Sequence, residues 1–106
     1  MAREDRRLLL HEELERVLGS DQVYYQTPTG RKMHYPAIVY SNSTGDYKYA
    51  DNRIYSYVDS YSVTLIIDDV TTDIVLKMLN HFYLIKPDGN PYISDDLYHY
   101  PFLLYY

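Results

Sequence analysis

An alternating run of side chains over residues 53–67 constrains the fold of this chain more than any other feature. From Tyr55 to Ile67 its odd positions are aromatic or aliphatic except at Asp59, and its even positions include serines and a threonine. Such alternation is typical of a strand that packs one face on a core and turns the other toward solvent. We therefore expect a strand over residues 53–67, in a β-sheet with one small-polar face.

This expected strand is longer than the domain that must contain it. Its residues extend about 50 Å at about 3.3 Å each, whereas a compact domain of 106 residues is about 33 Å across. Either the strand bends sharply, or its first third leaves the body of the molecule, and Asp59 marks a suitable exit point. We predict a projecting hairpin or loop over about residues 45–57.

Two helices and four further strands are expected around this strand. Apolar residues recur at helical spacing and are followed by a glycine stop signal, in Leu10, Leu14, Val17, Leu18 and Gly19. They predict a helix over about residues 4–18, and similar spacing predicts a shorter helix over about residues 70–80. The other strands are expected at residues 23–25, 37–40, 81–86 and 97–106.

The resulting element order, α-β-β-β-α-β-β, predicts the fold class. It is typical of an α+β fold with a mixed, mostly antiparallel sheet, here of about five strands. A chain of 106 residues has room for one domain, so we expect a single domain over residues 1–106.

The sequence offers no recognisable catalytic, cofactor-binding or metal-binding group. There is no cysteine, which excludes disulfides and thiolate metal sites. The histidines lie in four different elements without ligand spacing, at His11, His34, His81 and His99. Adjacent carboxylates, as in Asp68-Asp69 and Asp95-Asp96, point to opposite faces of an extended chain and do not converge on one atom. We expect neither enzymatic activity nor a cofactor.

Charge and hydropathy exclude two further classes of partner. The net charge is −5, and residues 49–106 hold eight acidic but only three basic side chains, unlike a DNA- or RNA-binding protein. The longest apolar runs, such as residues 8–10 and 102–104, are far shorter than the roughly 20 residues that span a bilayer. Acids interrupt the basic residues of the first segment, which does not predict a signal peptide. We expect no membrane partner.

Tyrosine is the residue in surplus. There are 15 tyrosines and no tryptophan, and a small core cannot satisfy so many buried phenols. Tyr61 and one face of the last strand are expected to fill the sheet, in line with the β-propensity of tyrosine. On the projection we predict a subunit interface instead, formed by Tyr47, Tyr49, Asp51, Asn52, Arg53, Tyr55 and Tyr57.

Several segments together resemble a known family. They are Tyr35–Tyr40, Tyr49–Asn52, Tyr61–Ile66, Asp96–His99 and Phe102–Tyr106. Their order, spacing and total length are similar to those of the small tail-terminator, or tail-completion, proteins of long-tailed, siphovirus-type bacteriophages. The turn at residues 87–91 departs from that pattern.

The resemblance implies a structural virion protein that assembles as a homo-oligomeric ring, commonly a hexamer. Such a ring sits at the head-proximal end of the tail tube and ends tube growth. Its partners are the major tail tube protein and the head-connector or neck proteins, and its place is the tail–neck junction, reached from the host cytoplasm during assembly. Acidic residues lining the lumen would repel phage DNA and let it pass unbound; the candidates are Asp68, Asp69, Asp73, Asp95 and Asp96.

Two alternatives remain open at this point. One is another neck component, such as a head–tail joining or head-completion protein of similar size. The other is an acidic soluble regulator or DNA mimic that binds a host protein. A ring or a tail-bound copy would favour the assembly classes, whereas a monomer or dimer with acids at phosphate-like spacing would favour the mimic.

Overall fold

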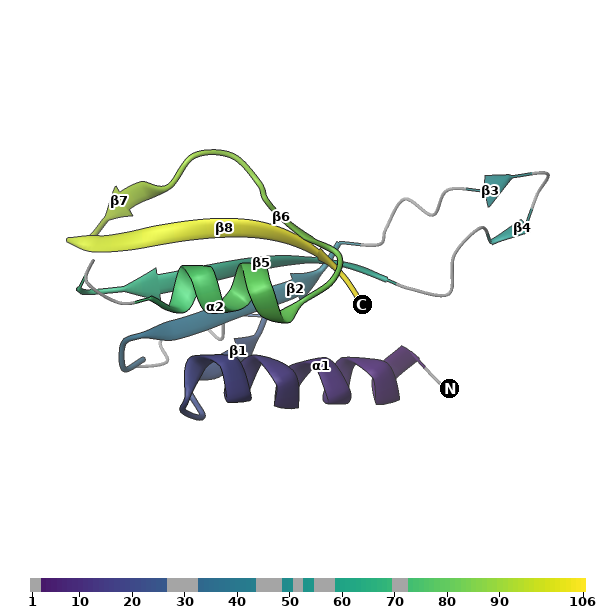
Figure 1. Ribbon diagram of the computed structural model, residues 1–106, viewed down its shortest axis with the longest axis horizontal. Coiled ribbons are helices and arrows are strands. Elements are labelled where there is room, and N and C mark those ends of the chain that lie inside the picture. Colours follow the sequence, from purple (N-terminus) through teal and green to yellow (C-terminus); the bar gives the residue numbers. More distant parts are fainter. Residues whose placement is uncertain (1–2, 27–32, 44–48, 51–52, 55–58, 70–72) are drawn as a thin grey trace.

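Two helices pack against one face of a mixed six-stranded sheet (Figure 1). The computed structural model describes residues 3–26, 33–43, 49–50, 53–54, 59–69 and 73–106. The main sheet has the strand order β1-β2-β5-β8-β6, and β7 also pairs with β8. All of its pairs are antiparallel except that of β1 with β2. The predicted α+β class and the predicted element order are confirmed.

Helix α1 spans Arg3–Leu18, close to the predicted range. Leu10 and Leu14 of its apolar stripe are fully buried against the sheet. Gly19 has a φ of +82°, and its N–H donates to the carbonyl oxygen of Glu15 at 2.8 Å. Because a residue without Cβ adopts this left-handed conformation at little cost, the glycine ends the helix where the sequence predicts.

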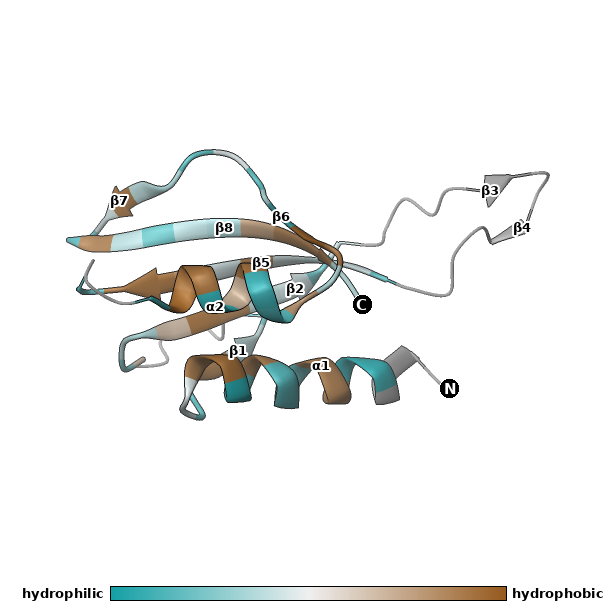
Figure 2. Cartoon of the chain, in the orientation of Figure 1, coloured by the Kyte–Doolittle hydropathy of each residue, from teal (hydrophilic) through white to brown (hydrophobic). Residues whose placement is uncertain are grey.

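Helix α2 spans Ile74–His81 and begins after the N-cap residue Asp73. Residues 70–72 of the predicted helix lie outside the described part of the chain. Ile74 and Met78 are buried against the sheet, and Figure 2 shows the hydrophobic colour in the first part of α2 and in the adjoining part of β5. Neither helix in the described part is long and apolar enough to cross a membrane.

The burial of side chains in the central strand of the sheet confirms the alternation expected from the sequence. Strand β5, Ser60–Ile67, lies between β2, Ala37–Asn42, and β8, Leu97–Tyr105. The odd positions of β5 are no more than 2% exposed, and they face the helices; they are Tyr61, Val63, Leu65 and Ile67. Strand β1 spans Val23–Tyr25, the residues predicted for it, and it pairs in parallel with β2 at one edge of the sheet.

The prediction of one continuous strand over residues 53–67 is wrong. Strand β5 begins at Ser60, directly after the proposed exit point. The backbone of Asp59 still pairs with Tyr106, through N–H···O contacts of 3.1 and 3.0 Å. The earlier part of the pattern forms β4, Arg53–Ile54, which pairs with β3, Tyr49–Ala50, in a separate two-stranded sheet. Figure 1 shows this sheet, the arm hairpin, apart from the main sheet.

The C-terminal third differs most from the prediction. His81 ends α2, so the expected strand over residues 81–86 is replaced by the shorter β6, Ile85–Pro87. An additional strand, β7, spans Tyr92–Ser94. Both pair with β8, but in registers that differ by two residues, because residues 88–91 lie opposite residues 100–101 only. This bulge separates the two short strands along the same side of β8.

Asp95 and Asp96 form the two-residue turn between β7 and β8. Their φ angles are +52° and +62°, and Ser94 pairs with Leu97 across the turn. Positive φ at both central residues defines the type I′ turn that suits the twist of a hairpin. The interpretation of this acid pair as turn residues is confirmed.

We expect Asp96→Gly to raise the free energy of unfolding by about 0.5–1 kcal/mol, because glycine adopts a positive φ without steric cost. Asp96→Val is expected to lower it by about 1–2 kcal/mol, since a β-branched residue is strained in this conformation. Urea unfolding measures both values. Asp88→Gly, in an exposed residue without a positive φ, is the control and should not stabilise; stabilisation there as well would contradict the turn argument.

Candidate functional site

The described part of the predicted interface is the arm hairpin. Tyr49 and Arg53 lie in β3 and β4, and the register pairs Tyr49 with Ile54 and Ala50 with Arg53. The other predicted interface residues lie outside the described residues; they are Tyr47, Asp51, Asn52, Tyr55 and Tyr57. Their contact with another subunit stays a prediction.

The five predicted lumen acids gather at one end of the subunit. Ile67, the last residue of β5, pairs with Tyr98 near the start of β8. That register brings Asp68 and Asp69 to the same end of the sheet as the Asp95-Asp96 turn, and Asp73 caps α2 at the beginning of the helix. All five are exposed. The structure thus brings the five acids to one end of the subunit. That they face a channel stays a prediction.

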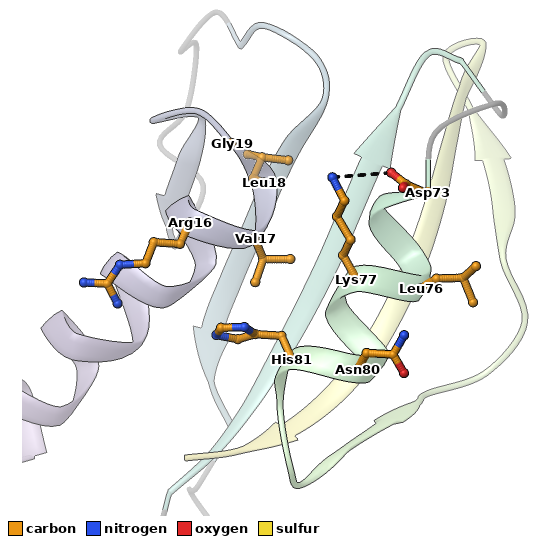
Figure 3. A pocket seen from close by; sticks show the side chains of 9 residues that line it. All are labelled: Arg16, Val17, Leu18, Gly19, Asp73, Leu76, Lys77, Asn80 and His81. Carbon is orange, nitrogen blue, oxygen red and sulfur yellow. Dashed lines mark ion pairs between the residues drawn. The ribbon is translucent and has the colours of Figure 1, made fainter.

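A groove of about 710 Å³ lies between the C-terminal half of α1 and α2. We call it the helix groove; it is lined by Arg16, Val17, Leu18, Gly19, Asp73, Leu76, Lys77, Asn80 and His81. In Figure 3 the side chains of Val17, Lys77 and His81 lie between the two helices, and Leu76 lies along the outer side of α2. Leu76 is 62% exposed.

The charged groups around the helix groove are paired with one another. The Lys77 ammonium lies 3.5 Å from the Asp73 carboxylate. The Glu13 carboxylate accepts hydrogen bonds from Arg16, three residues along α1, and from the Nε2 atom of His81, at 2.5 Å, on α2. The contact of Glu13 with His81 links the two helices, and the groove presents no strong charge of one sign.

The hydrogen bond from His81 lowers the pKa of Glu13, and the charge of nearby Arg16 acts in the same direction. The ionised carboxylate is therefore favoured in the folded state. Its contribution to stability is fully present above the ordinary glutamate pKa of about 4.3 and is lost as the pH falls through the lowered value.

We expect Glu13→Gln to lower the free energy of unfolding by less than about 1 kcal/mol at pH 7, because the pair is partly exposed. At pH 3 the difference from the unaltered protein should shrink, since the carboxylate is then being protonated. Urea unfolding at both pH values measures this. Glu12→Gln, at an exposed neighbour, should show no such change; an equal pH dependence in both variants would refute the link.

A partly buried polar cluster lies under the N-terminal half of α1. The hydroxyl of Tyr40, a residue only 1% exposed, contacts the Nδ1 atom of His11 at 2.8 Å and accepts from Arg7 at 3.4 Å. The Arg7 guanidinium also lies 4.2 Å from the ring centroid of Tyr25. Burial raises the pKa of Tyr40, and Arg7 partly opposes that rise. The cluster anchors α1 on β2.

The histidines make separate contacts and do not meet. His99 stacks on Tyr92 with a centroid separation of 4.8 Å and contacts the carbonyl oxygen of Leu97 through Nδ1, whereas His34 is exposed. No three histidine or acidic side chains of the described segments are grouped as metal ligands.

Sequence patterns missed the helix groove and the partly buried polar cluster. For each of these two features the sequence holds one signal that points to it. Leu76 is an apolar residue outside the Ile74–Met78 stripe of α2, and Arg7 and His11 lie four residues apart on α1. Neither signal is specific without the neighbouring element.

Comparison with models of protein families, with curated proteins and with solved structures finds no match for this chain.

Proposed function

We propose that this chain is a structural subunit of a phage tail, similar to tail terminators, that assembles as a six-membered ring around the tail axis at the head-proximal end of the tail tube. The observation that carries the proposal is the arm hairpin, a two-stranded sheet separate from the main sheet. It supports assembly because a two-stranded sheet is marginally stable by itself and gains stability when it packs on another surface.

Exposed apolar side chains beside a second groove add support to the proposal. Tyr83 is 97% exposed, and Leu84 and Tyr105 are each more than 40% exposed beside a second groove of about 370 Å³ near the end of β8. Tyrosine and leucine side chains grouped at a groove are typical of a contact between proteins. In the proposed ring this surface and the arm hairpin are the contacts with neighbouring subunits, the tail tube protein and the neck proteins.

The acidic end supports the second part of the proposal, passage of DNA without binding. Facing the lumen, the group formed by Asp68, Asp69, Asp73, Asp95 and Asp96 repels phosphates. The same grouping is the one observation that favours the alternative of a DNA mimic, whose acids would bind a basic host protein instead.

Light scattering after size-exclusion chromatography, followed by electron microscopy, tests the proposal. We expect a species of about six times the subunit mass of 12.6 kDa, seen as a ring, and antibody labelling of phage particles at the tail–neck junction. A monomer or dimer that captures a DNA-binding protein would favour the mimic. Label on the head side of the neck would favour a head-completion protein, and label on the capsid shell would refute the proposal.

A further inference from the structure

Exposed apolar side chains border the second groove, which we call the Arg6 groove. Its lining comes from α1, from the segment after α2 and from the end of β8: Arg6, Glu13, residues 81–84, Tyr105 and Tyr106. Tyr83 and Leu84 are exposed, and the exposed Leu9 lies between Arg6 and Glu13 on the same side of α1. Tyrosine and apolar side chains around an arginine are typical of the centre of a contact between proteins.

The Arg6 groove contains a cation that has no counterion in the described part of the chain. The Arg6 guanidinium lies 5.5 Å from the centroid of the Tyr106 ring. Its Nε atom is covered and has no hydrogen-bond partner among the described residues, and no described carboxylate forms an ion pair with it. Glu13 is bonded to His81 and Arg16 instead. An occupant that covers this groove must therefore bring a carboxylate, because a covered and unpaired cation is costly.

The tip of the β7–β8 hairpin, residues 92–97, carries the opposite charge. We call it the acidic tip. Its turn residues Asp95 and Asp96 are exposed, and Tyr92 and Ile93 beside them are both more than half exposed. The acidic tip thus presents two carboxylates next to apolar side chains. This is the combination that matches an unpaired arginine with an apolar border.

The acidic tip and the Arg6 groove lie at opposite ends of β8. The tip leads into Leu97, the first residue of the strand, whereas Tyr105, its last residue, lines the groove. The nine residues of β8 extend about 30 Å, and Figure 1 shows the turn after β7 and the C-terminus at opposite ends of this strand. The tip of one copy therefore does not reach its own groove, and a contact between the two surfaces joins one copy to the next.

We propose that the acidic tip of a second copy docks in the Arg6 groove. The carboxylates of the turn pair with Arg6, and Ile93 packs against Tyr83. The inference rests on the proposed ring and names two surfaces that meet in it. The contact is heterologous, because the tip and the groove are different surfaces, and repetition of a heterologous contact closes into a ring when the rotation permits.

The contact also divides the acidic end of the subunit between two roles. A carboxylate that pairs with Arg6 is covered by the next subunit and does not face a channel. Asp95 and Asp96 then belong to the subunit contact, which leaves Asp68, Asp69 and Asp73 as the residues that would face DNA in the proposed lumen.

Removal of the turn charges tests the contact, with self-association measured by light scattering. Asp95→Asn combined with Asp96→Asn should weaken association at least tenfold, and asparagine keeps the turn because it also tolerates a positive φ. The control, Asp68→Asn combined with Asp88→Asn, removes the same charge at exposed positions. It should leave association unchanged or strengthen it, because a smaller net charge lowers the repulsion between copies. Unchanged association in the first variant, or equal weakening in both, would overturn the inference.

Arg6→Gln tests whether Arg6 is the partner of the turn charges. Alone, it should weaken association about as much as the two turn substitutions do. Added to them, it should weaken association no further, because the interaction is already lost. Circular dichroism and urea unfolding check that the variant is folded. Losses that add up would show that Arg6 and the turn carboxylates do not meet, and would overturn the inference.

Covalent capture tests the geometry, because the chain has no cysteine of its own. Ile93→Cys combined with Tyr83→Cys should give a ladder of covalent multimers on a denaturing gel after treatment with a short bismaleimide. The control replaces Tyr83→Cys with Leu76→Cys, another exposed residue, and should give no ladder. No ladder from the first pair, a product that stops at the dimer, or equal ladders from both pairs would each overturn the inference.

The measurements separate the contact from the ring. Rings that form equally well without the turn charges would refute the docking of the acidic tip and leave the proposed ring intact. A protein that stays monomeric at all concentrations would refute both.

Discussion

Replacement of Tyr61 by alanine is expected to lower the free energy of unfolding by about 3–5 kcal/mol, whereas replacement by phenylalanine is expected to raise it by about 1 kcal/mol. The ring of Tyr61 is fully buried at the centre of the sheet, so its removal leaves a large cavity. Its hydroxyl is also buried but has no hydrogen-bond partner in the described structure. Phenylalanine keeps the packing and removes the unpaired group.

Tyr40→Phe is the matched control for Tyr61→Phe. The Tyr40 hydroxyl is bonded to His11 at 2.8 Å, so its loss leaves the imidazole without that partner and should cost about 1–2 kcal/mol. The two Tyr→Phe substitutions are thus expected to have opposite signs in urea unfolding. Destabilisation of similar size in both would show that the Tyr61 hydroxyl does have a partner.

The pH dependence gives an independent check on Tyr61. Burial, together with the negative charge of Asp59, raises the pKa of this phenol. Its contribution to stability is fully present below the ordinary tyrosine pKa of about 10 and is lost as the pH rises through the raised value. Above about pH 10 the free energy of unfolding should therefore fall less steeply for Tyr61→Phe than for the unaltered protein.

Leu14→Ala is expected to lower the free energy of unfolding by about 2–5 kcal/mol. Leu14 is fully buried between α1 and the sheet, and a cavity at this position loosens the contact of α1 with the sheet. Because small domains are stable by only about 5–15 kcal/mol, this single change removes a large part of the total. Urea or thermal unfolding followed by circular dichroism measures it.

Leu9→Ala is the control for this prediction. Leu9 lies on the same helix and loses the same atoms on substitution, but it is 41% exposed. Its replacement should cost less than about 1 kcal/mol, because no closed cavity forms. Similar losses in the two variants would mean that α1 does not pack on the sheet through its Leu10–Leu14 stripe.

The sequence predicted those helices and strands in which buried apolar residues recur at a regular spacing without interruption. The stripe of α1 and the alternation of β5 are of this kind, because every buried position is apolar. Strand β7 was missed because Tyr92 and Ile93 are both more than half exposed, so its pairing with β8 leaves no alternation in the sequence. The end of α2 was misplaced because His81 and Phe82 suit a strand as well as a helix end.

The candidate site was less predictable than the fold for a physical reason. Surplus tyrosines predict an interface, but they do not predict which surface would receive them. The helix groove is made by α1 and α2, whose contact is fixed by long-range packing and by the pair of Glu13 with His81, 68 residues apart. The acidic end likewise appears only when the register of β5 with β8 brings separate pairs of carboxylates together.

The bulge between β6 and β7 bears on how the protein behaves when concentrated. A free sheet edge can recruit strands of other molecules and grow into fibrils. Here the edge beside β8 changes register at residues 88–91, and Pro87 and Pro91 offer no N–H group for an added strand. Lys86 places a charge on the same edge. Open-ended addition of strands is thereby disfavoured on that side, so this edge resists edge-to-edge aggregation when the protein is concentrated.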